Sequence, residues 1–336
     1  MLSYAIVSVG NWRWGFSTSG EISMRNEAAY LANPEGSRLI RAITHLVVWL
    51  PAAGALAGLG LALTRGVSGY AWVSLLVMYV LTVTGVELGL HRYVSHHAFR
   101  AHPVVEFFLV TFGSMAAQGG PLYWASTHRR HHAFSDRPGD PHSPHLSGGG
   151  PRGCLTGMLH AHMGWLFQPV HSDWLRYVPD LIKDSRLFTL HRLYFLWIAL
   201  GVLLPAAVGL IWTQSLYGAL EGLLWGGLGR IFLVHHAVWG VNSLCHVFGS
   251  RPFATREQSR NLAWMALPSL GGAWHNNHHA FPRTADNRLR WWQFDFCGMV
   301  ARILERTGLI RDVHYADPES FVAVPSSQKP PVAMEG

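Results

Sequence analysis

The chain has 336 residues, of which 49% are hydrophobic and only 13% are charged. Soluble domains carry about 25% charged residues, so this composition, with its 15 Trp and 35 Gly, indicates an integral membrane protein. The net charge of +7 could suit nucleic acid, but the basic residues are scattered and form no nucleic-acid-binding motif. The three cysteines lack the spacing of a disulfide framework or a thiolate metal site.

Four apolar segments are long enough to predict membrane-spanning helices. They cover about residues 43–63, 70–90, 193–212 and 216–238. A further apolar segment, residues 104–117, is too short to cross and is expected to be a buried or interfacial helix. The polar segments 91–192 and 247–315 are expected to form a helical cap outside the bilayer. The predicted fold is therefore an all-α integral membrane protein with four transmembrane helices and a cap, in a single domain spanning residues 42–315.

Both ends of the chain are expected to lie on the side of the cap. Residues 1–41 form an N-terminal cytosolic or interfacial segment, and residues 316–336 form a tail expected to be disordered. In this topology every Lys and Arg except Arg65 and Arg230 lies on one face, which the positive-inside rule assigns to the cytosol. The first residues are apolar without a preceding basic region, so no signal peptide is predicted, and Met1 and Met24 both remain possible starts.

Histidines cluster on this cytosolic side. His128, His131 and His132 are spaced i, i+3, i+4, and residues 275, 278 and 279 repeat the spacing, which places three imidazoles on one face of a helix. A looser cluster starts at His91, directly after the second predicted span. Neutral imidazole binds iron, zinc, copper or nickel. So many histidines without a thiolate exceed the needs of one ion and predict a site for two metal ions, although spacing does not distinguish iron from zinc.

Several longer motifs surround these histidines. In chain order they are His91-Arg92-Tyr93-Val94-Ser95-His96; Gln118-Gly119-Gly120-Pro121, followed by Trp124 and His128-Arg129-Arg130-His131-His132; Ser135-Asp136 with Asp140-Pro141-His142; His162-Met163-Gly164-Trp165; Val241-Asn242-Ser243-Leu244-Cys245-His246 with Gly249-Ser250-Arg251-Pro252; and Trp274-His275-Asn276-Asn277-His278-His279-Ala280-Phe281-Pro282. In this combination and order, residues 40–315 resemble the membrane fatty acid desaturases of the stearoyl-CoA, or Δ9 acyl-CoA/acyl-lipid, type.

The resemblance implies a set of metal ligands for two Fe²⁺ ions in a cytosolic cap above four spanning helices. It also implies a narrow, kinked tunnel for an acyl chain, with Trp124 and Trp239 at matching aromatic positions. Asn242 matches an asparagine that holds a metal through water. The histidines at the positions of the family's ligands are His91, His96, His128, His131, His132, His246, His275, His278 and His279.

The chain also departs from the family pattern. His97 stands where the family usually has Arg, and it is not needed as a further ligand. Gly272 stands where relatives often carry Glu, so any support from that carboxylate comes from elsewhere or is absent. Glu87 precedes His91 by four residues and is a candidate to orient its imidazole, with a merely interfacial acid as the alternative. Arg230, a charge within a span, is expected to pair with Glu221 or with a backbone carbonyl.

The implied reaction is the insertion of a cis double bond, at Δ9, into a saturated acyl chain, with O2 as co-substrate. The substrate is a long-chain acyl-CoA or acyl-lipid, and two electrons come from an external ferredoxin-, rubredoxin- or cytochrome b5-like carrier. No catalytic residue is needed beyond the metal ligands. One alternative is a polyhistidine di-iron hydroxylase or alkane monooxygenase, against which the Asn-x-x-x-His and His-Asn-Asn-His-His motifs argue. The other is a His-rich membrane metal transporter, which would place its ligands within the spans. The acyl carrier, chain length and oligomeric state stay open.

Overall fold

The computed structural model describes residues 30–32, 37–168 and 170–317. Met24, most of the predicted segment 1–41 and nearly all of the predicted tail 316–336 lie outside these residues. The helices and strands are β1 (Tyr30–Ala32), α2 (Ser37–Arg65), α3 (Gly69–Thr84), η1 (Gly85–Ser95), β2 (Arg100–Ala101), α4 (Pro103–Met115), α5 (Pro121–Phe134), α6 (Gly150–His162), η2 (Gly164–Phe167), β3 (Val170–Ser172), α7 (Trp174–Tyr177), α8 (Pro179–Ile182), α9 (Ser185–Arg192), α10 (Tyr194–Thr213), α11 (Leu216–Glu221), η3 (Gly222–Gly229), α12 (Arg230–Leu244), η4 (Ala263–Ala266), α13 (His275–Ala280), α14 (Phe296–Arg306) and β4 (Ile310–Arg311).

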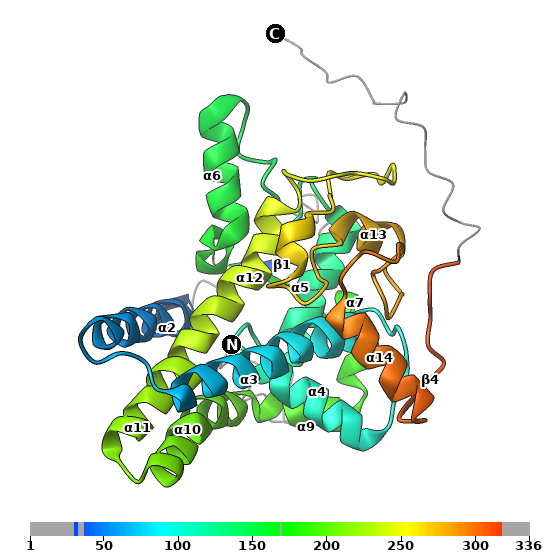
Figure 1. Cartoon of the computed structure of the whole chain (residues 1–336). Helices are drawn as coiled ribbons and strands as arrows, with labels where there is room; N and C mark the ends of the chain where they lie inside the picture. Colours follow the sequence, from blue (N-terminus) through cyan, green and yellow to red (C-terminus); the bar gives the residue numbers. More distant parts are fainter. Residues whose placement is uncertain (1–29, 33–36, 169, 318–336) are drawn as a thin grey trace, which may run out of the picture.

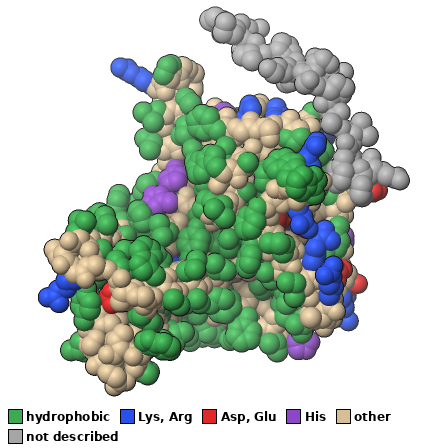
Figure 2. Space-filling model, viewed as in Figure 1, with side chains coloured by type: hydrophobic (Ala, Val, Ile, Leu, Met, Phe, Trp, Pro, Cys, Tyr) green, Lys and Arg blue, Asp and Glu red, His purple; other side chains and the backbone are tan. Residues whose placement is uncertain are grey.

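Three helical segments in the described part of the chain are long and apolar enough to cross a membrane. They are Arg38–Arg65, Gly69–Ser95 and Tyr194–Thr213. They expose large apolar side chains, such as Leu56 and Leu63 of α2, which are 70% and 82% exposed. Figure 2 shows hydrophobic side chains over much of one face of the molecule. The predicted span 216–238 coincides with α11, η3 and α12, which follow one another without a break. It is not among the three segments, because Glu221 and Arg230 lower its mean hydropathy.

The second of these segments changes from an α-helix to a π-helix at Gly85. This change was not predicted, because apolar content does not distinguish the two kinds of helix. The π-helical half, η1, lies close against α4, where a Cβ on Gly85 would be 2.1 Å from the Gly113 nitrogen and one on Gly89 would be 2.6 Å from the Leu109 oxygen. Residues 103–115 form the predicted short apolar helix, α4. π-Helical turns occur frequently at functional sites, and η1 carries the first histidine motif.

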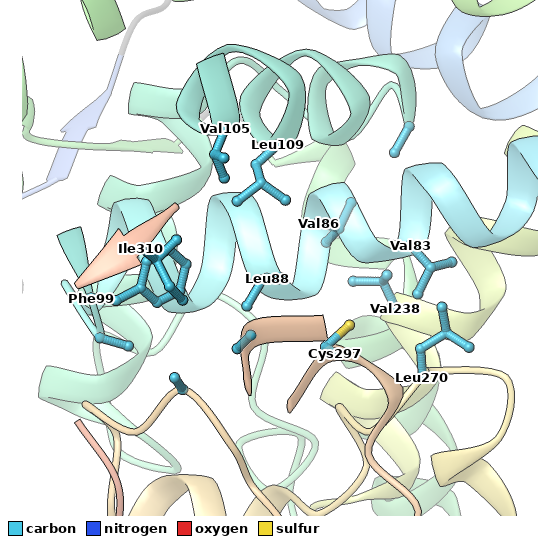
Figure 3. Packing of buried hydrophobic residues seen from close by; sticks show 14 of the residues in the cluster. Val83, Val86, Leu88, Phe99, Val105, Leu109, Val238, Leu270, Cys297 and Ile310 are labelled. Atoms are coloured by element: carbon cyan, nitrogen blue, oxygen red, sulfur yellow. The ribbon is translucent and has the colours of Figure 1, made fainter. Parts of the chain in front are cut away.

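A buried apolar cluster joins η1 to the end of the chain (Figure 3). Val86 and Leu88 of η1 pack between α4 on one side and Leu270 and Cys297 on the other. Beside this cluster, Arg92 makes two hydrogen bonds to Asp295, at 2.9 and 3.0 Å, and both side chains are fully buried. The two small antiparallel sheets, β1–β3 and β2–β4, tie further distant segments together. The C-terminal segment around Asp295 and Cys297 is therefore anchored on the π-helical half of a membrane-type helix.

Candidate metal centre

Nine histidines converge as two neighbouring groups. Within each group, one ring nitrogen of every histidine lies within 4.8 Å of the corresponding nitrogens of the others. The five-histidine group is His91, His96, His128, His132 and His278, and the four-histidine group is His131, His246, His275 and His279. These are the nine histidines that the resemblance implied, and the structure brings all of them together.

Four separate stretches of chain supply the nine side chains. His91 lies in η1 and His96 directly follows it. The i, i+3, i+4 spacing places the three histidines of α5 and the three of α13 on one face of each helix. His246 follows the end of α12. Figure 1 shows α5, α12 and α13 meeting in one part of the molecule.

The ring nitrogens of each group point toward one another. In the five-histidine group, His278 Nε2 lies 2.9 Å from His91 Nε2 and 2.9 Å from His132 Nε2. In the four-histidine group, His275 Nε2 lies 3.0 Å from His246 Nε2 and 3.1 Å from His279 Nε2. The rings of His132 and His279 stack at 4.4 Å, so the two groups adjoin. Converging nitrogen atoms at these distances form two donor sets suited to a transition metal ion each.

Carboxylates hold the opposite ring nitrogen of several of these histidines. Nδ1 of His91, His131 and His246 lies 3.2 Å from Glu87, 2.9 Å from Asp140 and 2.9 Å from Asp136, respectively. Nδ1 of His279 is 3.6 Å from Glu257. Such contacts select the tautomer whose Nε2 carries the lone pair, and they fix the orientation of a metal-ligating ring.

The charge state of the cluster also fits metal ligation. Burial, followed by the repulsion of neighbouring imidazoles, holds the pKa of six of the histidines well below the usual 6.5, so they are neutral at pH 7; these are His96, His128, His132, His275, His278 and His279. His131 Nε2 is buried and has no hydrogen-bond partner among the described residues. A buried polar atom without a partner is costly, and a metal ion at this point would satisfy it.

Side-chain amides hold α13 in place. Asn261 Oδ1 accepts hydrogen bonds from the backbone N–H groups of Asn276 and Asn277, at 3.0 and 3.2 Å. Asn261 Nδ2 donates to Asn277 Oδ1 at 2.7 Å. Asn276 pairs with the backbone of Phe253 through both its amide atoms. The two asparagines of the His-Asn-Asn-His-His motif therefore orient the short helix that carries three of the nine histidines.

A cavity leads to the five-histidine group. Its lining includes His128, Trp124, Trp239 and Asn242. Trp124 stacks on the His128 ring at 4.9 Å. The lining also includes Thr44, Val47 and Val48 of α2, a helix of the membrane-spanning type. An apolar, aromatic-lined space thus joins a membrane-type helix to the histidines.

Sequence comparison agrees with this geometry, because the model of a family described as "Fatty acid desaturase" matches residues 67–309. The chain belongs to the fatty acid desaturase family. This desaturase is 41% identical over 266 residues to a hex-5-enoyl-[acyl-carrier protein] acetylenase of Moorena producens, covering 79% of the chain and 83% of the relative. It is 37% identical over 258 residues to an sn-1 stearoyl-lipid 9-desaturase of Anabaena variabilis, covering 74% and 87%. It is 35% identical over 248 residues to a Delta-9 acyl-lipid desaturase of Arabidopsis thaliana, covering 73% and 76%.

Two side chains singled out in the sequence lie outside both histidine groups of the desaturase. The side chain of His97 is 52% exposed and pairs with Asp180 at 2.7 Å. Arg230 is fully buried and donates to the carbonyls of Met115, Gly201 and Gly226, at 2.6, 2.7 and 3.2 Å. Of its two expected partners, backbone carbonyls are therefore the ones found, whereas Glu221 accepts from the Ser68 N–H.

Asp136, Asp140 and Glu257 contact histidines of the two groups although their sequence positions predicted no role for them. The first two belong to motifs quoted for the resemblance, but their contacts with the histidines depend on loops whose paths spacing does not reveal. Asp136 lies 110 residues before its partner His246. The resemblance to known motifs pointed to Asp136 and Asp140, whereas no signal in the sequence pointed to Glu257.

Proposed function

We propose that this desaturase inserts a cis double bond at Δ9 of a long-chain saturated acyl group, using O2 and two electrons from an external carrier. The observation that carries the proposal is the pair of adjoining histidine groups at the end of an aromatic-lined cavity. The relatives named as 9-desaturases and Delta-9 desaturases support the position of the double bond.

The donor set supports two iron ions, held by the five histidines of one group and the four of the other. Asn242, one helical turn before His246 and in the cavity lining, is proposed to complete the four-histidine set through a water molecule. When bound, the iron pair would supply the O2-activating chemistry that removes hydrogen from two adjacent methylenes. The protein's own residues orient the ligand rings through the carboxylates on their outer nitrogens.

The cavity is proposed to position the acyl chain. Trp124, stacked on His128, and Trp239, which is 5% exposed, would confine the hydrocarbon next to the histidines and exclude water from it. Selectivity for one C–C bond then follows from the depth to which the chain enters, because small displacements of a reacting group cost large factors in rate.

The proposed membrane arrangement has four spans, with both termini and the metal centre in the cytosol. The continuous helix from α11 to α12 supports a fourth span, since its buried Glu221 and Arg230 have partners inside the protein and buried paired charges are tolerated in membrane helices. The distribution of Lys and Arg supports the orientation.

The proposed substrate is an acyl-lipid or acyl-CoA, and the names of two relatives favour the lipid. The electron carrier is proposed to be a separate ferredoxin-, rubredoxin- or cytochrome b5-like protein.

The test is expression in a host that lacks unsaturated fatty acids. We expect a new cis double bond at Δ9, located by mass spectrometry of derivatised lipids, together with about two irons per purified chain. His275→Ala should abolish the product, whereas His160→Ala, in α6 and outside both groups, should retain it. A hydroxylated product would instead indicate the monooxygenase alternative, and protein that binds metal but alters no acyl chain would overturn the proposal. Comparing lipid-bound and CoA-bound acyl pools identifies the carrier.

A further inference from the structure

Glu87 is an acid buried inside a membrane-type helix. It is 4% exposed, and its Oε2 lies 3.2 Å from Nδ1 of His91 on the next turn of η1. The nearest cation in the sequence, Arg92, makes its two carboxylate hydrogen bonds to Asp295. Because an unpaired carboxylate is expensive to bury, the contact with His91 accounts for the position of this acid.

The space around the carboxylate is provided by a glycine from a distant part of the chain. A Cβ at Gly272 would lie 2.4 Å from Oε1, 2.6 Å from Cδ and 2.8 Å from Oε2 of Glu87. The backbone of Gly272 does not adopt the left-handed conformation that favours glycine, in contrast to Gly271 with φ of +111°. The backbone conformation of Gly272 would therefore allow a side chain. The three atoms nearest to such a Cβ all belong to Glu87.

This contact joins two of the elements that carry the metal-binding histidines. Gly272 lies three residues before His275, the first residue of α13, and Glu87 lies four residues before His91. His91 Nε2 and His278 Nε2 are 2.9 Å apart, so a rotation of the His91 ring would move one of the five converging nitrogens of its group. The carboxylate is wedged between a ligand ring and the segment that leads into the other ligand helix.

We propose that Glu87 and Gly272 form one unit: Glu87 is a positioning residue for His91, and position 272 is glycine because the carboxylate occupies the volume of its side chain. This inference rests on the proposed role of His91 as a metal ligand. It predicts that the site requires a carboxylate in this volume and accepts one from either position. An Asp at 272 would project its carboxylate from a Cβ that already lies 2.4 Å from the present oxygen.

The experiment compares variants of the full-length desaturase for iron affinity, by competition with a chelator, and for the Mössbauer spectrum of the iron-loaded protein. Glu87→Ala should weaken the binding of iron by about 10- to 100-fold, the usual effect of removing a group that orients a ligand. Glu87→Gln, whose amide oxygen still accepts from Nδ1, should stay near the wild type. Gly272→Ala should resemble Glu87→Ala, because the methyl group displaces the carboxylate.

Two double variants separate positioning from general damage. Glu87→Ala/Gly272→Ala should be no worse than Glu87→Ala alone, since the methyl group then enters empty space; such non-additivity measures direct coupling. Glu87→Ala/Gly272→Asp should recover iron affinity and the wild-type spectrum. Gly60→Ala, where a Cβ meets nothing within 4 Å, and Glu221→Ala, a buried acid that belongs to neither histidine group, are the matched controls and should bind iron normally.

Wild-type iron affinity in Glu87→Ala, or strictly additive losses in the first double variant, would overturn the inference. The inference would also be contradicted if Glu87→Ala/Gly272→Asp remained monodisperse but did not recover the binding of iron. These outcomes differ from failure of the proposed function, in which the wild-type protein itself would bind no iron or would bind iron and leave acyl chains unaltered.

Discussion

The carboxylate of Asp136, which contacts His246 of the four-histidine group, also holds two loop segments. Asp136 Oδ2 accepts from His246 Nδ1 and from the Gln258 N–H at 2.8 Å, and Oδ1 accepts from the Ser143 hydroxyl at 2.7 Å. Although burial raises the pKa of Asp136, these hydrogen bonds prevail and hold it well below its usual range. The side chain is therefore an anion that both orients the His246 ring and joins two segments.

Asp136→Ala should consequently lower the affinity of the four-histidine group for iron by about 10- to 100-fold. Metal analysis should find nearer one iron per chain than two. Asp312→Ala, which removes an exposed ion pair with Arg100, is the matched control and should keep two irons per chain. Two irons retained by Asp136→Ala under chelator competition would show that the carboxylate is not needed to orient His246.

His191 confers sensitivity to acid without belonging to either histidine group. Burial lowers its pKa to about 4 from 6.5, and its ring lies edge-on to Trp174 at a centroid distance of 5.2 Å. A histidine whose pKa is lower in the folded than in the unfolded protein costs no stability above pH 6.5. Below that pH the unfolded state takes up the proton first, so stability falls until the pH reaches about 4.

At pH 5 this difference amounts to about 2 kcal/mol. His191→Phe keeps an aromatic ring and removes the titration, so the apparent Tm of the metal-free protein in detergent should fall less between pH 7.5 and pH 5 than in the wild type. An equal fall in both proteins would contradict the assignment.

At the scale of elements, Arg230 joins three helices inside the proposed membrane region. Its donors reach carbonyls at the end of α4, within α10 and within η3. Arg230→Leu would remove these three buried hydrogen bonds, and each buried polar group that is left unsatisfied costs about 1–3 kcal/mol. We expect a loss of about 3 kcal/mol or more, seen as aggregation at lower temperature in detergent, whereas Arg65→Leu at the exposed end of α2 should behave as the wild type. A stable Arg230→Leu protein would show that these bonds are dispensable.

Much of the histidine cluster could be predicted because six of its nine members repeat at helical spacing. The triplets of α5 and α13 lie on single helical faces, and that local rule holds whatever the rest of the fold does. The resemblance supplied His91, His96 and His246, which have no such spacing. The π-helical form of η1 could not be predicted, since it depends on close packing of Gly85 and Gly89 against α4. The contacts of Asp136 and Glu257 likewise depend on how distant loops fold.

At the scale of the whole molecule, the proposed topology can be tested with a natural cysteine. Cys154 in α6 is exposed, whereas Cys245 and Cys297 are buried. If the cap is cytosolic, a membrane-impermeant maleimide should label Cys154 in inverted vesicles but not in intact spheroplasts.

Val67→Cys, between α2 and α3, and Gln214→Cys, between α10 and α11, should show the opposite pattern in a Cys154→Ser background. Labelling of Val67→Cys and Gln214→Cys from opposite sides would exclude four spans with this arrangement.

The buried pair between Arg92 and Asp295 has a consequence for biosynthesis. Arg92 follows the first metal-site histidine in the sequence, and Asp295 comes after the last, 203 residues later. While the chain is being made, the π-helix enters the bilayer long before its charge partner exists, and the guanidinium must remain solvated until then. The first histidine motif can take its final position only when almost the entire polypeptide has left the ribosome, so at the proposed iron site loading of metal would follow translation rather than accompany it.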